Sequence, residues 1–224
     1  MNISVGCEYA PDVEELIETL PGAKKDIYED DAEDLLEQIA EQNAMKPVSV
    51  WKELTVTAVE EKNLELDGVT LNCQVLAERL SAGDKLYGAV FTAGKELHQM
   101  LEDCDDIMQE YILGFLMSHI LTLKTVDVVE ELIKATGSNH VEMFMAGIPD
   151  ICAMDQQIQI EKMLKAEFEA AGVCVKKCGS LTPTYSSTAL FLISDSETNI
   201  PVNWNDKTER NAFGGMLFES AGHS

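Results

Sequence analysis

The chain has 224 residues, of which 40 are Asp or Glu and 16 are Lys or Arg, so its formal net charge is −24. Binding to a polyanion requires a cationic face that displaces phosphate counterions, and so few dispersed basic residues provide none. We therefore expect no nucleic-acid partner and no anionic membrane partner. The hydrophobic fraction of 46% is sufficient for an ordinary folded core.

Two helical patterns open the chain. In residues 11–20 apolar side chains recur at i, i+3, i+4 and i+7 behind Pro11, which suits a helix start. A second apolar face follows the acidic stretch 29–31, where acidic residues favour the first turn of a helix. We predict an N-terminal helical segment over residues 1–46, packed on the domain that follows. The apolar positions are Val13, Leu16, Ile17 and Leu20, then Leu35, Leu36 and Ile39.

From residue 47 the chain is predicted to form one compact domain that ends at residue 194. Alternating residues over 48–57 predict a strand, and LELDGVTL predicts a hairpin that turns at Asp67-Gly68. Further on, the patterns predict a helix over 73–81, a buried strand over 86–92 and a helix over 95–102.

The second half of this domain is predicted to be mainly helical. Residues 105–135 predict two helices with a break near Lys124-Thr125, and Gly137 supplies a helix stop. The polar tail, residues 195–224, is expected to be partly disordered or to wrap around the periphery. The remaining predictions are strands at 141–146, 173–175 and 187–194, a helix over 155–171 and a loop around Thr182-Pro183.

The six cysteines bear on the cellular compartment. The opening MNISVGCEYA has neither the basic nor the apolar region of an export signal, so we expect a cytoplasmic protein with reduced thiols. The longest apolar run, Tyr111 to Leu123, is too short to span a bilayer, so no membrane association is expected.

Familiar catalytic motifs are missing from the sequence. Neither a dinucleotide-binding glycine turn nor a phosphate loop occurs, and no pair of histidines has the HExxH spacing of a zinc hydrolase. We predict no catalytic residues and no resident metal. Cys174 and Cys178, together with Cys152 as a third residue, remain a weak candidate for a thiol or metal site.

The order of four segments resembles the activation domain of cobalamin (vitamin B12)-dependent methionine synthase and its small stand-alone relatives. The resemblance covers residues 50–194 and implies an α+β fold with a mixed or antiparallel sheet and long flanking helices. The segments are AVFTAG at 89–94, Tyr111-Ile112-Leu113, MFMAGIPD at 143–150 and LTPTYSST at 181–188.

In that family the glycine loop and its arginine help to hold S-adenosylmethionine, which donates the methyl group when an oxidised corrinoid is rescued. The resemblance therefore implies a protein that binds S-adenosylmethionine, a corrinoid-binding or methyltransferase protein, or both, and that supplies no nucleophile. Met143 and Tyr185 stand where the family has its arginine and a lysine. The implied ligand-binding residues are Met143, Met145, Gly147, Ile148, Asp150, Thr182, Pro183, Tyr185 and Ser186.

Two other functions stay open. The same fold could have changed its ligand, with Met143, Met145 and Ile148 making a more apolar pocket for another small molecule or a partner. Alternatively, the cysteines near the two candidate loops could form a metal or thiol site.

Overall fold

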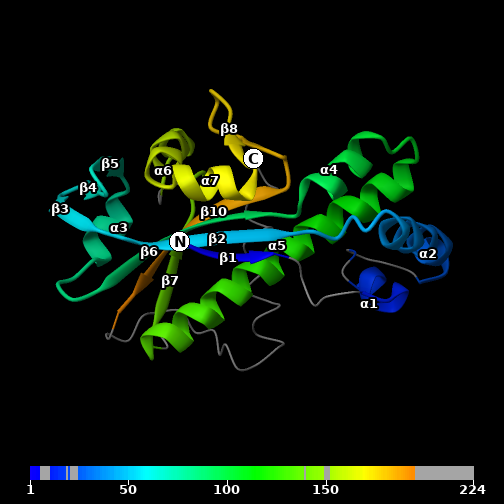
Figure 1. The fold of residues 1–224 in the computed structure, drawn as a ribbon, viewed down its shortest axis with the longest axis horizontal. Coiled ribbons are helices and arrows are strands. Elements are labelled where there is room, and N and C mark those ends of the chain that lie inside the picture. Colours follow the sequence, from blue (N-terminus) through cyan, green and yellow to red (C-terminus); the bar gives the residue numbers. More distant parts are fainter. Residues whose placement is uncertain (6–10, 19, 21–24, 139, 149–151, 195–224) are drawn as a thin grey trace.

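A five-stranded antiparallel sheet forms the centre of the protein, in the strand order β1-β2-β6-β10-β7 (Figure 1). The structure is a computed structural model, and it describes residues 1–5, 11–18, 20, 25–138, 140–148 and 152–194. With helices on both faces of this sheet, the α+β class predicted from the sequence is confirmed. The strands are β1 (Asn2–Val5), β2 (Val48–Leu54), β6 (Lys85–Thr92), β7 (Val141–Phe144) and β10 (Ser186–Ile193).

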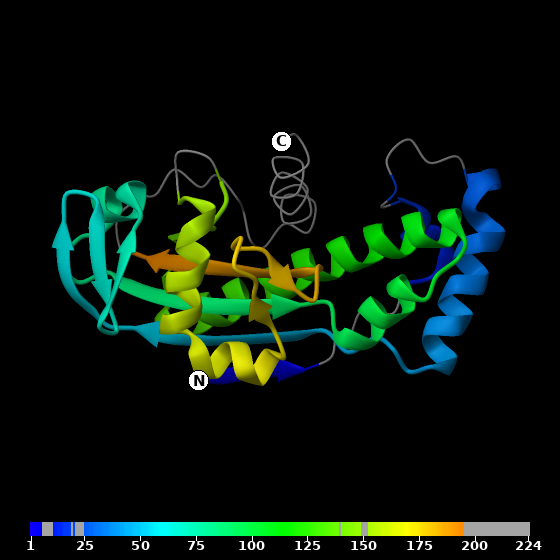
Figure 2. The same cartoon turned by 90° about the horizontal axis from the view of Figure 1, so that it is seen from above.

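Helices cover both faces of the sheet, which is why β6 and β10 are almost continuously apolar. Helix α5 (Ile107–Thr136) packs on one face, and α6 (Gln157–Met163) and α7 (Lys165–Ala171) pack on the other (Figures 1 and 2). Alternate residues of each strand point to opposite faces of the sheet and pack into a separate apolar core on each face. Tyr87, Ala89, Phe91, Ala189 and Phe191 face α5, whereas Leu86, Val90, Leu190 and Leu192 face α6 and α7.

The two ends of the molecule differ in structure (Figure 2). At one end the first half of α5 packs with three helices: α1 (Val13–Glu18), α2 (Lys25–Glu41) and α4 (Lys95–Glu102). At the other end lie α3 (Gln74–Arg79) and a small sheet of β3 (Val56–Glu60), β4 (Asn63–Leu66) and β5 (Val69–Asn72). The turn between β4 and β5 has positive φ at Asp67 and Gly68, so the predicted hairpin is confirmed.

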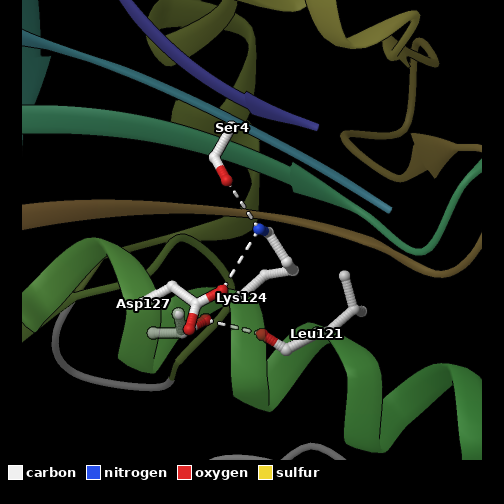
Figure 3. A network of polar contacts seen from close by, with 5 residues as sticks. Ser4, Leu121, Lys124 and Asp127 are labelled. Atoms are coloured by element: carbon white, nitrogen blue, oxygen red, sulfur yellow. Dashed lines mark hydrogen bonds and ion pairs between the residues drawn. The ribbon is translucent and has the colours of Figure 1, made fainter. Parts of the chain in front are cut away.

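Helix α5 is continuous over 30 residues, and the predicted break near Lys124-Thr125 is wrong. The polar side chains of Lys124 and Thr125 find hydrogen-bond partners while their backbone remains helical. Lys124 Nζ donates a hydrogen bond to Ser4 Oγ (2.9 Å) and forms an ion pair with Asp127 Oδ2 (3.2 Å) (Figure 3). Thr125 Oγ1 donates to the carbonyl of Leu121 (2.9 Å).

The ends of α5 follow ordinary capping rules. The side chain of Asp106 accepts hydrogen bonds from the N–H groups of Met108 (2.8 Å) and Gln109 (3.0 Å), and Gly137 adopts the left-handed conformation that stops the helix. By length and composition alone α5 could cross a membrane. However, 72% of its most apolar 18-residue window is buried inside the protein, so it serves as a core helix of this fold.

The predicted helix over 155–171 is also wrong as a single element. A short 3-10 turn, η1 (Met154–Gln156), precedes α6, and Leu164 separates α6 from α7. Leu164 turns into the sheet, where a Cβ added to Gly88 would lie 2.8 Å from Leu164 Cδ2. The break between α6 and α7 therefore falls at the residue that packs most closely against β6 at Gly88.

The sequence patterns did not predict the first strand, and they predicted some strands to be longer than they are. β1 was not predicted, although it pairs with β2 along its whole length. A two-stranded ribbon of β8 (Cys174–Val175) and β9 (Leu181–Thr182) leads into β10. The polar tail, residues 195–224, lies outside the described residues, and the division of the chain at residues 47 and 195 stays a prediction.

Candidate functional site

Two loops singled out in the sequence adjoin strand β10: residues 181–186 lead into it, and residues 145–148 follow β7, which pairs with its second half. Together with the turn after β6, they are called the loop corner (residues 92–94, 145–148 and 181–186). In the register of the sheet, Ser186 pairs with Thr92 and Leu190 pairs with Phe144. The end of β6 therefore lies beside the start of β10, whereas the end of β7 lies beside Leu190, four residues further along that strand. Segments about 90 residues apart in sequence are brought to one place by strand pairing alone.

Hydrogen bonds join the turn after β6 to the segment before β10. The N–H of Ala93 donates to the carbonyl of Tyr185 (3.0 Å), and the hydroxyl of Ser186 donates to Thr92 Oγ1 (3.1 Å). The N–H of Gly94 also donates to Thr92 Oγ1 (3.2 Å). Gly94 has φ 105°, and a Cβ there would lie 2.7 Å from the carbonyl oxygen of Lys46, so only glycine fits this turn.

Gly147 lies in the loop after β7 and is covered by a methionine. Its φ is 91°, and its N–H donates to the carbonyl of Cys152 (2.8 Å). A Cβ on Gly147 would lie 2.5 Å from Met154 Cε, and a Cβ on Gly179 would lie 2.6 Å from the carbonyl oxygen of Met154. Met154 is thus held between two glycines, and its side chain occupies the space directly above Gly147.

The other predicted ligand-binding residues are distributed as follows. Met143, Met145 and Tyr185 are half-buried and pack against the apolar cluster on the α5 face. Ile148 is half-buried, and Pro183 is buried after a cis peptide bond with Thr182. Asp150 lies outside the described residues. Tyr185 and Ser186 thus lie against the turn after β6, Gly147 lies against Met154 in the loop after β7, and the role of all three in binding stays a prediction.

A buried polar pair beside the loop corner was not identified from the sequence. Thr188 Oγ1 donates to Gln157 Oε1 (2.9 Å), and both residues are almost fully buried. Within the described part of the chain the amide nitrogen of Gln157 has no hydrogen-bond partner, and neither has Thr182 Oγ1. A buried donor of this kind is costly, and polar residues on an apolar strand and helix were the only signal for it in the sequence.

The cysteines are not arranged as the thiol or metal hypothesis requires. Cys152 is buried beside Cys73, whereas Cys174 and Cys178 are exposed. A hydrogen bond from the Cys152 thiol lowers the pKa of Cys73 to about 7, against the opposing effect of burial, and the pKa of Cys152 is raised by the same pairing. Among the described residues no three His, Cys, Asp or Glu side chains are grouped as a metal site.

A cavity of about 460 Å³ lies next to the loop corner, between Tyr185 and the first half of α5. Tyr185 approaches the helix closely, because a Cβ on Gly114 would lie 2.6 Å from the tyrosine hydroxyl. Burial and the charge of Glu110 both raise the pKa of Tyr185, in that order of importance. The cavity is lined by Leu101, Ile107, Glu110, Tyr111, Gly114, Phe115, Ser118 and Tyr185.

Comparison with known proteins identifies the fold. The chain is similar to a crystal structure of the MetH reactivation domain bound to AdoHcy, with a TM-score of 0.60 and 12% sequence identity. The match covers 88% of this chain and 80% of that one. No protein-family model and no curated protein sequence matches the chain. At this identity the likeness establishes a shared fold, and it confirms the α+β architecture that the order of segments implied.

Proposed function

We propose that the protein is a binding module for an S-adenosyl ligand, S-adenosylmethionine or AdoHcy, held at the loop corner. The observation that supports the proposal is the fold shared with the MetH reactivation domain bound to AdoHcy, in which Gly147 and the Tyr185-Ser186 segment, assigned to the ligand by resemblance, belong to loops that adjoin the same strand, β10. Such a module supplies binding and no nucleophile.

The chemistry of the loop corner is that of backbone and hydroxyl recognition. Gly147 offers a side-chain-free backbone at positive φ, and the half-buried hydroxyl of Ser186, which donates to Thr92 Oγ1, can still accept a hydrogen bond from a ribose hydroxyl or an amino group. Met143 replaces the arginine of the family and cannot pair with a ligand carboxylate. We therefore expect binding weaker than an arginine-anchored site would give, by about 30-fold or more.

A corrinoid-binding or methyltransferase protein is the partner that this function implies. With a net charge of −24, the module would be attracted to a partner whose docking face is basic. A corrinoid-loaded protein titrated with this module, with and without S-adenosylmethionine, should then show a change in its visible corrinoid spectrum.

The first experiment is calorimetric titration of the full chain with S-adenosylmethionine and with AdoHcy at low salt. Binding in the micromolar to millimolar range at one site supports the proposal. The variant Met143→Arg restores the missing anchor and should bind about tenfold more tightly. Val59→Arg makes the same charge change at an exposed position of β3 and serves as the matched control.

The outcomes separate the alternatives. If neither the native chain nor Met143→Arg releases heat up to millimolar ligand, the proposal is wrong and the fold has changed its ligand. If Val59→Arg strengthens binding as much as Met143→Arg does, general charge attraction explains the gain and the loop corner is not the site.

A further inference from the structure

The helical end of the molecule carries much of the chain's negative charge. Residues 11–46 and 95–119 contain 18 Asp or Glu and only four Lys, with no Arg. This density of carboxylates raises the local concentration of cations and repels anions. The cavity beside Tyr185 opens within this acidic region, at the first half of α5.

Aromatic rings dominate one side of that cavity. Tyr111 and Phe115 lie with ring centroids 4.8 Å apart at an angle of 57°, and Tyr185 packs close to Gly114 on the same helix. Tyr111 lines the cavity and is 37% exposed, and its ring also stacks on that of Tyr28, with centroids 6.3 Å apart. Ring faces carry negative electrostatic potential and attract cations, most strongly those with a poorly hydrated alkyl shell.

One carboxylate belongs to the same lining. Glu110 is exposed at the cavity, and among the residues that the structure describes it has no ion-pair partner. It lies close enough to Tyr185 for its charge to affect that phenol. Rings and an uncompensated carboxylate together form the chemical setting in which proteins recognise alkylated ammonium groups.

We propose that this cavity binds a small alkylated ammonium cation of the choline type, through Tyr111, Phe115 and Tyr185 and through the charge of Glu110. The inference goes beyond the S-adenosyl ligand and does not depend on it, although Tyr185 borders both places. A phosphorylated form of the same cation is disfavoured, because its phosphate would enter the acidic region.

The test is a nuclear magnetic resonance titration of the full ¹⁵N-labelled chain at low salt with three probes. Choline carries the cation, 3,3-dimethylbutan-1-ol is its uncharged carbon analogue, and phosphocholine adds a phosphate. We expect choline to shift the amide signals of residues lining the cavity, with the neutral analogue at least about fivefold weaker. Phosphocholine should also bind more weakly than choline. Equal binding of choline and the neutral analogue, or no shift with choline, overturns the proposal.

Two variants locate the site. Glu110→Gln removes the carboxylate at an exposed position, and Phe115→Leu removes a ring while keeping an apolar side chain; each should weaken choline binding about three- to tenfold. Glu131→Gln changes the net charge equally on an exposed part of the same helix and should leave choline binding unchanged. Because Glu110 is exposed, its variant should fold normally. Unchanged choline binding in Glu110→Gln, or an equal loss in Glu131→Gln, contradicts the assignment.

Discussion

The side chain of Met154 lies against the backbone of Gly147, so closely that a Cβ on the glycine would be 2.5 Å from Met154 Cε. The contact joins the loop after β7 to the turn before α6. It also determines how each of these residues can be replaced, because one partner is fixed backbone and the other is the end of a flexible side chain.

Replacing Gly147 by alanine should destabilise the protein by about 1–2 kcal/mol. Most of the cost arises because φ of 91° is strained for any residue with a Cβ, and the methionine end can shift aside. Urea unfolding of Gly147→Ala and of Gly147→Ala with Met154→Ala measures both parts. Adding Met154→Ala to Gly147→Ala should recover only a minor part of the lost free energy of unfolding. Full recovery would show that the steric contact, and not the backbone conformation, requires glycine.

Met154→Ala should strengthen the binding of S-adenosylmethionine if the ligand uses the backbone of Gly147. The methionine side chain is 48% exposed and occupies the approach to that backbone, so the native chain must move it before the ligand binds. We expect a gain of about three- to tenfold in affinity, measured by calorimetry. Val59→Ala removes an equally exposed apolar side chain and should have no effect. A loss of affinity in Met154→Ala would mean that the methionine contacts the ligand directly.

Lys124→Ala should destabilise the fold by about 2–4 kcal/mol, because it removes a buried side chain and leaves Asp127 and Ser4 without its ammonium group. The loss should concentrate at β1, which Ser4 belongs to, and amide hydrogen exchange of residues 2–5 should speed up most. Lys134→Ala on the exposed face of the same helix, where the lysine pairs with Glu130, should cost less than about 1 kcal/mol. Similar costs for the two variants would disprove a special role of Lys124.

The Cys73–Cys152 pair should make stability depend on pH. The hydrogen bond from Cys152 holds the pKa of Cys73 near 7, below the ordinary thiol value, so the folded state releases its proton first. Stability should therefore rise as the pH increases from about 7 to 9, by at most about 3 kcal/mol. Above pH 9 it should fall again, because the unfolded chain ionises Cys152 more readily than the folded one does.

Urea unfolding at pH 7, 8 and 9 measures this dependence. Cys152→Ala removes the hydrogen bond, so the rise in stability between pH 7 and 9 should disappear in that variant. Cys174→Ala alters an exposed cysteine outside the pair and should keep the rise. A rise that survives in Cys152→Ala would assign it to other groups.

The elements that the sequence predicted well carry local signals. The Asp67-Gly68 turn, the helix over 95–102 and the stop at Gly137 each follow from a few neighbouring residues. The errors fall where a distant residue decides. Lys124 lies in the helix with its ammonium group bonded to Ser4, 120 residues away, and the helix after Met154 breaks at Leu164, which packs against Gly88.

The candidate site shows the same division. The order of segments was enough to predict the fold, and the binding role that it implies for the Gly147 loop and the Tyr185-Ser186 segment stays a prediction. The cover that Met154 gives to Gly147, the Thr188–Gln157 pair and the Cys73–Cys152 pair depend on side chains that meet only in the folded chain. No spacing in the sequence could reveal them.

The unbroken course of α5 has a consequence for how the protein unfolds. At about 1.5 Å per residue its 30 residues extend roughly 45 Å. Its first half contributes Ile112, Leu116 and Ile120 to the helical end, and its second half contributes Val128 and Leu132 to the core under the sheet. Because α5 belongs to both cores, unfolding of this helix in one core would also expose the apolar side chains of the other. We expect both to melt in one cooperative transition, with the central amides of α5 exchanging only through global opening.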